Sequence, residues 1–291
     1  MTSAEESVRA GRLDEALADL QGQVRKKPAD AKLRTFLFQL LAVRGDWERA
    51  LTQLKVAADL DPATVAMVKT YQEALRCEIL RADVFAGRRT PMLFGKPSEW
   101  MALLVQAVSL GAAGKFDEAR QLRDKAFELA PPTSGKLDDQ PFAWIADADQ
   151  RLGPMLEAIV NGRYYWIPFS RLSEIRIEKP TDLRDIAWTP VNLLLANGGE
   201  AVALVPTRYP GSETAADPRL GMARGTEWVE HPGETFFGVG QRLLATDQGE
   251  FALMDVRSIK LDSVADDALA VAGDAAAGEP APAEPKSAEP K

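Results

Sequence analysis

The sequence predicts an α+β protein, in which an array of tetratricopeptide-like helical hairpins is followed by a β-rich domain built from hairpins and by a disordered tail. Two observations support this. A pattern of glycine, bulky apolar residue, alanine and proline recurs up to Pro131, and three short turn signals separate apolar runs after residue 150. The composition changes at Pro131-Pro132-Thr-Ser-Gly-Lys. The predicted domains are residues 1–133, 134–263 and 264–291.

The repeated unit begins at Gly11, Gly45 and Gly114, and in each copy a proline follows 17 residues later. The first two copies are 34 residues apart, the tetratricopeptide period, and the third follows after 69 residues, two periods plus one. An alanine at a fixed offset lets the two helices of a hairpin approach closely, and the proline cannot continue a helix. The pattern is typical of a scaffold that binds a segment of another protein.

The helices of the array are predicted from apolar residues at three- and four-residue steps. The first helix of each hairpin precedes the glycine, at residues 31–44 and 98–113, and only a shortened one fits before Gly11. Residues 64–87 form one long predicted helix, and residues 92–97 a loop.

The β-rich half is predicted from three turn signals that need residues with positive φ. They join 156–160 to 163–167 at Asn161-Gly162, 191–196 to 200–205 at Asn197-Gly198-Gly199, and 241–246 to 250–256 at Asp247-Gln248-Gly249. Two further elements are a short helix at 142–152 and an additional edge strand at 174–178.

The composition excludes several classes of protein. The net charge is −8, and half of it lies in residues 264–291, so no concentrated basic face is available for a nucleic-acid backbone. The same segment has no periodic apolar residues and is predicted to be disordered, either as a solvated tail or as a docking segment. Cys77 is the only cysteine, so an internal disulfide is impossible. With no secretion signal and no apolar run of membrane-spanning length, the predicted location is the cytoplasm.

The sequence predicts no cofactor and no metal site. His231 is the only histidine, Gly238-Val239-Gly240 lacks the third glycine of a dinucleotide motif, and Cys77 reads as a small core residue. An alternative hypothesis is an enzyme of unknown reaction, with a site in the β-rich half. Its residues would be Arg208, Glu213, Glu227 and His231. Segment 206–213 is either a turn or a recognition loop that presents Arg208 and Tyr209.

Four stretches of the second half resemble one protein family. They are NGRYYWIPFSRLSEIRIEKPTDLRDIAWTP (161–190), NGGEAVALVPTRYPGSE (197–213), TEW (226–228) and GQRLLATDQGEFALMDVRSI (240–259). They resemble the ImpE/TagJ family, also called SciE-like, of accessory proteins of bacterial type VI secretion systems, and the resemblance extends over the chain to about Asp262. It implies a non-enzymatic adaptor that binds a helix near the N-terminus of the contractile sheath's small subunit. It also implies association with the hexameric AAA+ unfoldase that recycles contracted sheath.

The preferred partner-binding residues lie on the predicted helix 31–44, where apolar anchors at helical spacing suit helix-in-groove binding. They are Phe36, Gln39, Leu40 and Val43, and for each the alternative is ordinary core packing. Arg208 and Tyr209 are the second candidates. A general chaperone-like array is a third hypothesis, and the residues leave open both a homo-oligomer and which domain binds the sheath helix.

Overall fold

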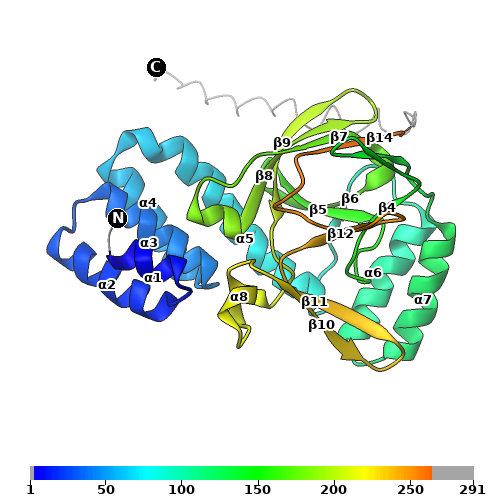
Figure 1. Ribbon diagram of the computed structural model, residues 1–291, viewed down its shortest axis with the longest axis horizontal. Helices are drawn as coiled ribbons and strands as arrows, with labels where there is room; N and C mark the ends of the chain where they lie inside the picture. The colour runs from blue at the N-terminus through cyan, green and yellow to red at the C-terminus, as the bar shows by residue number, and fades with distance from the viewer. Residues whose placement is uncertain (1–2, 264–291) are drawn as a thin grey trace, which may run out of the picture.

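The computed structural model describes residues 3–263. Helices α1–α4 form a lobe at one end, α5 runs from this lobe toward the middle, and a strongly bent sheet with α6 and α7 forms the other end (Figure 1). The predicted tail, 264–291, lies outside the described residues. The helices are α1 (Ser3–Arg9), α2 (Leu13–Lys26), α3 (Ala31–Val43), α4 (Trp47–Leu60), α5 (Val65–Phe85), α6 (Glu99–Ala112), α7 (Phe116–Leu129) and α8 (Pro218–Gly221).

The predicted α+β class, with helices first and strands after, is confirmed. The first helix is short, as expected, and each repeated glycine follows the first helix of a hairpin with a positive φ: +75° at Gly11, +72° at Gly45 and +76° at Gly114. At Gly45 the backbone closes the end of α3, because its N–H and that of Asp46 donate to the carbonyls of Ala42 and Leu41. The glycine thus marks the turn between the two helices of a hairpin.

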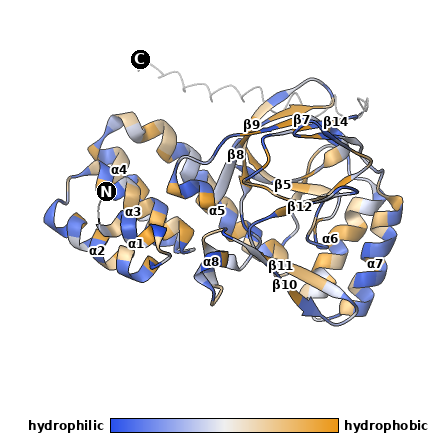
Figure 2. Cartoon of the chain, in the orientation of Figure 1, coloured by the Kyte–Doolittle hydropathy of each residue, from blue (hydrophilic) through white to orange (hydrophobic). Residues whose placement is uncertain are grey.

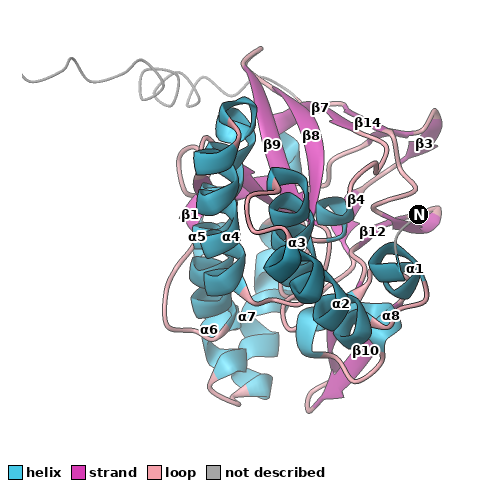
Figure 3. Ribbon diagram, turned by 90° about the vertical axis from the view of Figure 1, so that its left-hand side faces the viewer, coloured by secondary structure: helices cyan, strands magenta, loops and turns pink. Residues whose placement is uncertain are grey.

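The third hairpin lies apart from the first two. Figure 3 shows α5 and α4 standing side by side, with α3 and α2 next to them. The α6–α7 hairpin instead packs on the β-rich part, where the Phe116 ring stacks on His231 at 4.9 Å. Most residues of α6 are hydrophobic, whereas hydrophobic and hydrophilic residues alternate along α7 (Figure 2). This difference arises because one side of α7 faces the solvent.

The main sheet has nine strands in the order β1-β6-β5-β9-β8-β7-β14-β2-β3. All neighbours are antiparallel except β1 and β6. Two smaller sheets have the orders β13-β12-β4 and β10-β11. The strands are β1 (Met92–Leu93), β2 (Gly135–Leu137), β3 (Gln140–Phe142), β4 (Ile145–Asp147), β5 (Met155–Val160), β6 (Arg163–Pro168), β7 (Leu172–Ile177), β8 (Trp188–Leu195), β9 (Glu200–Pro206), β10 (Thr226–His231), β11 (Thr235–Gly240), β12 (Leu243–Thr246), β13 (Gly249–Ala252) and β14 (Ser258–Leu261).

The three predicted hairpins are confirmed as β5–β6, β8–β9 and β12–β13. Three other predictions are wrong. Residues 142–152 are not a helix but contain β4, which pairs with β12. The predicted loop at 92–97 contains β1, a short parallel partner of β6. The strand β7 is not an edge, because it lies between β8 and β14.

Two hydrophobic cores lie on opposite faces of the main sheet. The first is shared by the helices and by side chains of β5, β6 and β8, and at its centre the rings of Phe38, Tyr71 and Trp188 follow one another at 5.6–5.8 Å. The second is enclosed by the strands and includes Ile167, Leu193 and Ile259. The first core contains residues from both sides of the predicted boundary at residue 133. The domain boundaries drawn from the sequence therefore stay a prediction.

Candidate functional site

A cleft of about 500 Å³ opens in the helical lobe. Its walls are α1, α3, the turn after α4 and a segment of the β-rich part. The lining residues are Glu5, Val8, Arg9, Ala31, Lys32, Thr35, Phe36, Gln39, Asp61, Thr64, Thr181, Asp182 and Leu183. The cleft is therefore mixed in chemistry, with an aromatic ring, hydroxyl and amide groups, and charges of both signs.

Helix α3 forms the longest wall. The Asp30 carboxylate caps its start by accepting from the N–H groups of Lys32 (3.0 Å) and Leu33 (3.2 Å). Lys32 and Phe36 are four residues apart and Phe36 and Gln39 three, so these side chains share one face of the helix. All three face the cleft.

The opposite wall comes from residues 181–183, which sequence reasoning missed. They enter the turn η3 (Leu183–Ile186), where the side chains of Asp182 and Asp185 form a capping box. Leu183 packs against the helical core. The Arg184 guanidinium lies 4.7 Å from the Tyr71 ring centroid and donates to Asp182 at 2.5 Å. These contacts fix the segment against the helices. The Asp-x-x-Asp spacing marked a turn, although nothing local placed it beside α3.

The structure separates the four residues predicted on α3. Phe36 is half-buried and lines the cleft, as does Gln39, which is 8% exposed. Leu40 and Val43 are 0% and 1% exposed and belong to the first core. Burial leaves these two side chains no free surface for a partner in this structure.

Arg208 and Tyr209 are also buried. The Arg208 guanidinium donates to the carbonyl oxygens of Val43, at 2.7 Å, and Gly221. The Tyr209 hydroxyl donates to Asp147 at 3.1 Å and accepts from the Leu243 N–H at 3.0 Å. Tyr209 therefore links segments of the β-rich part, and Arg208 ties this part to the end of α3.

Of the four residues of the enzyme hypothesis, the structure brings Arg208 and Glu213 close enough for their charges to interact, and it places Glu227 and His231 elsewhere on β10. Arg208 is committed to backbone carbonyls, whereas Glu213 lies against Gly45. Glu227 is exposed on β10, and His231 at the end of that strand stacks on Phe116. Among residues 3–263, no three His, Cys, Asp or Glu side chains lie close enough together to hold a metal ion.

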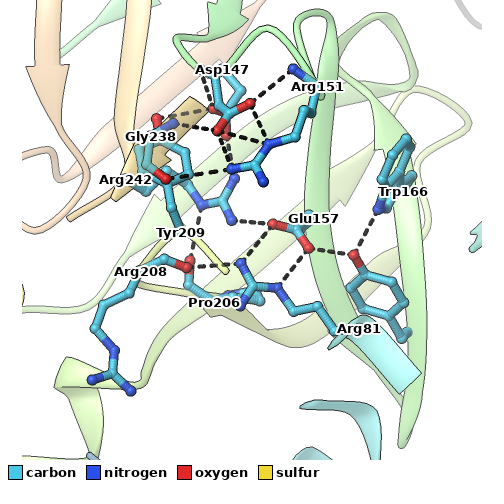
Figure 4. Close-up of polar contacts among 12 residues, drawn as sticks. Arg81, Asp147, Arg151, Glu157, Trp166, Pro206, Arg208, Tyr209, Gly238 and Arg242 are labelled. Atoms are coloured by element: carbon cyan, nitrogen blue, oxygen red, sulfur yellow. Dashed lines mark hydrogen bonds and ion pairs between the residues drawn. The ribbon is translucent and has the colours of Figure 1, made fainter. Parts of the chain in front are cut away.

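A buried charge network joins α5 to the three strands β4, β5 and β6 (Figure 4). Arg81 of α5 donates to both carboxylate oxygens of Glu157 on β5, at 2.8 and 3.0 Å. Arg242 bridges Glu157 to Asp147 on β4, and the Tyr164 hydroxyl donates to Glu157. The side chains of Glu157, Asp147 and Arg242 are 0% exposed.

The network is extended on both sides. Glu78, one turn before Arg81, accepts from the Trp188 indole at 2.9 Å. Asp149 pairs with Arg151 at 2.5 Å and accepts from the Gly238 N–H at 2.8 Å. Arg81 also donates to the Arg208 carbonyl at 2.8 Å, while the Arg208 side chain points away (Figure 4). Every buried charge here therefore has a partner, as a dry interior requires.

The two central carboxyls differ in acidity. Burial alone would raise the pKa of Glu157, but the guanidinium groups of Arg81 and Arg242 outweigh it and lower the pKa to about 2. Burial raises the pKa of Asp147 to about 6, against the attraction of Arg242 and with the help of nearby Asp149.

The Glu157 shift predicts a specific acid sensitivity. Its folded-state pKa lies below its ordinary value of 4.5, so its ionisation stabilises the fold above pH 4.5, and this contribution is lost as the pH falls through 2. Denaturant unfolding of the unaltered chain and of Glu157→Gln, at several pH values, should therefore give a stability difference that shrinks steadily below pH 4.5. A difference that is constant down to pH 2 would contradict the assignment.

Comparison with known proteins relates the chain to one protein family and to one solved structure. The ImpE protein family matches residues 139–260. The type VI secretion system accessory component TagJ of Pseudomonas aeruginosa is 52% identical over 259 residues, which are 89% of this chain and 91% of that protein. The crystal structure of protein VPA1032 from Vibrio parahaemolyticus has the same fold, with a TM-score of 0.82 over 92% of this chain and 100% of that one, at 23% identity.

No helix within residues 3–263 is both long and apolar enough to cross a membrane. The family match falls in the β-rich part, and the similarity to TagJ extends well beyond it, over 89% of the chain. With more than half of the aligned residues identical over nearly all of both proteins, the chain belongs to the ImpE/TagJ family of type VI secretion system accessory proteins.

Proposed function

We propose that this protein is a non-enzymatic adaptor of a type VI secretion system, which captures a helix of the contractile sheath's small subunit in the cleft of the helical lobe. The shape and lining of the cleft are the observation that supports this proposal most directly. It is open, its volume is about 500 Å³, and α3 presents Phe36 to it as an aromatic anchor. A groove with an apolar anchor on a rigid helix suits the binding of an amphipathic helix.

The rigidity of the cleft supports this role. The capped start of α3 and the turn η3 are both fixed by hydrogen bonds, and Arg208 ties the end of α3 to the β-rich part. A cleft that is formed before binding loses less conformational entropy when a partner enters. The β-rich part in this view holds the cleft in shape, and it offers a separate surface for the sheath-recycling AAA+ unfoldase. This assembly would take place in the cytoplasm.

The test is capture of the sheath small subunit by the purified full-length chain. We expect the subunit to be retained, and retention to be lost when its N-terminal helix is deleted. The isolated helix, made as a peptide, should compete with the whole subunit. Retention that survives the deletion would contradict helix capture, and turnover of a substrate by the purified chain would contradict the non-enzymatic role.

A further inference from the structure

The charged residues of the cleft are not equally engaged. Among its acids, Asp61 accepts from the Ala63 N–H at 3.0 Å, and Asp182 pairs with Arg184 at 2.5 Å. Glu5 also has a partner. Within the described residues, the side chains of Arg9 and Lys32 have no ion pair and no hydrogen bond, although both line the cleft.

Both cations are exposed, and among the charged side chains of the cleft they are the two that pair with no described residue. Arg9 lies in the last turn of α1 and Lys32 in the first turn of α3, so the cleft receives one cation from each of two helices. A carboxylate suits both side chains as a partner, because it accepts hydrogen bonds from ammonium and guanidinium groups and carries the opposite charge.

The position of this carboxylate follows from the α3 wall. Lys32 and Phe36 stand one helical turn apart on the same face. A helix lying along α3 meets Phe36 with an apolar side chain, and it meets Lys32 with a side chain one turn away from that anchor. The spacing of three or four residues is set by helix geometry in the partner as well.

Building on the proposed function, we infer that the captured sheath helix carries an aspartate or glutamate one turn from its apolar anchor, held between Lys32 and Arg9. The apolar contact supplies most of the affinity, and the carboxylate fixes the register and direction of the helix in the cleft. Electrostatic pairs at the rim of an interface contribute in this way to specificity and to the association rate.

The experiment uses the full-length chain and a labelled peptide of the sheath subunit's N-terminal helix, with binding followed by fluorescence anisotropy. Lys32→Glu should weaken binding about tenfold at low salt, because it replaces attraction by repulsion, and the loss should be smaller at high salt. Lys55→Glu is the matched control, since Lys55 is exposed on α4 and lies outside the cleft. The affinity of Lys55→Glu for the peptide should stay within about twofold of the affinity of the unaltered chain.

Reversing the charges on both the peptide and the protein tests the inference directly. Each acidic residue of the peptide is replaced by lysine in turn, and one of these peptides should bind Lys32→Glu better than it binds the unaltered chain. If Lys32→Glu and Arg9→Glu both bind the original peptide as the unaltered chain does, the inference is wrong while helix capture stands. If the unaltered chain does not bind the peptide at all, the proposed function fails together with the inference.

Discussion

Replacing Glu157 by glutamine should lower the free energy of unfolding at pH 7 by about 3–5 kcal/mol, because it leaves two buried guanidinium groups without their shared counter-charge. Arg81 and Arg242 both donate to this carboxylate, and all three side chains are almost completely buried. The amide keeps the shape of the side chain but offers one neutral acceptor in place of two charged oxygens. Urea unfolding followed by circular dichroism measures the change.

The control is Glu73→Gln, which removes the carboxylate of an exposed pair with Arg76 on the same helix α5 as Arg81. Exposed pairs of this kind contribute between 0 and about 1 kcal/mol. A loss at Glu157 no larger than that at Glu73 would mean that the interior charges are solvated well enough to stand alone, and the network would then not hold α5 on the sheet.

Local signals made much of the fold predictable. The turn at Asn161 and Gly162 adopts positive φ at both residues, 49° and 73°, as its sequence requires, and the repeated glycines end their helices in the left-handed region. Strand β4 could not be found in this way. It has only three residues, its partner β12 lies about a hundred residues further on, and Phe142 and Ile145 are spaced as on a helix.

The site was predictable only in part for the same reason. Helical spacing placed Phe36 and Gln39 on the face of α3 that lines the cleft, whereas Leu40 and Val43 turned out to fill the core. The wall at 181–183 depends on packing between segments far apart in sequence, which no local pattern encodes. Glu78 and Arg81 likewise carried no local signal of their burial, since an acid and a base three residues apart on a helix usually form a surface pair.

Shortening Phe36 to alanine should weaken binding of the sheath helix at least thirtyfold. A half-buried aromatic ring that lines a cleft is the kind of residue whose truncation costs about 2 kcal/mol or more of binding energy. Fluorescence anisotropy with the sheath helix peptide measures the change. The fold should survive, because the ring only borders the first core and the fully buried side chains of α3 remain in place.

Leu33→Ala separates a lost contact from a weakened fold. Leu33 lies on α3 three residues before Phe36, is partly buried against the same core, and does not line the cleft. The two variants should lose similar stability in urea, and only Phe36→Ala should lose affinity. If both bound the peptide as well as the unaltered chain, the sheath helix would have to bind outside this cleft. If both lost affinity in proportion to their stability, α3 would support the site without touching the partner.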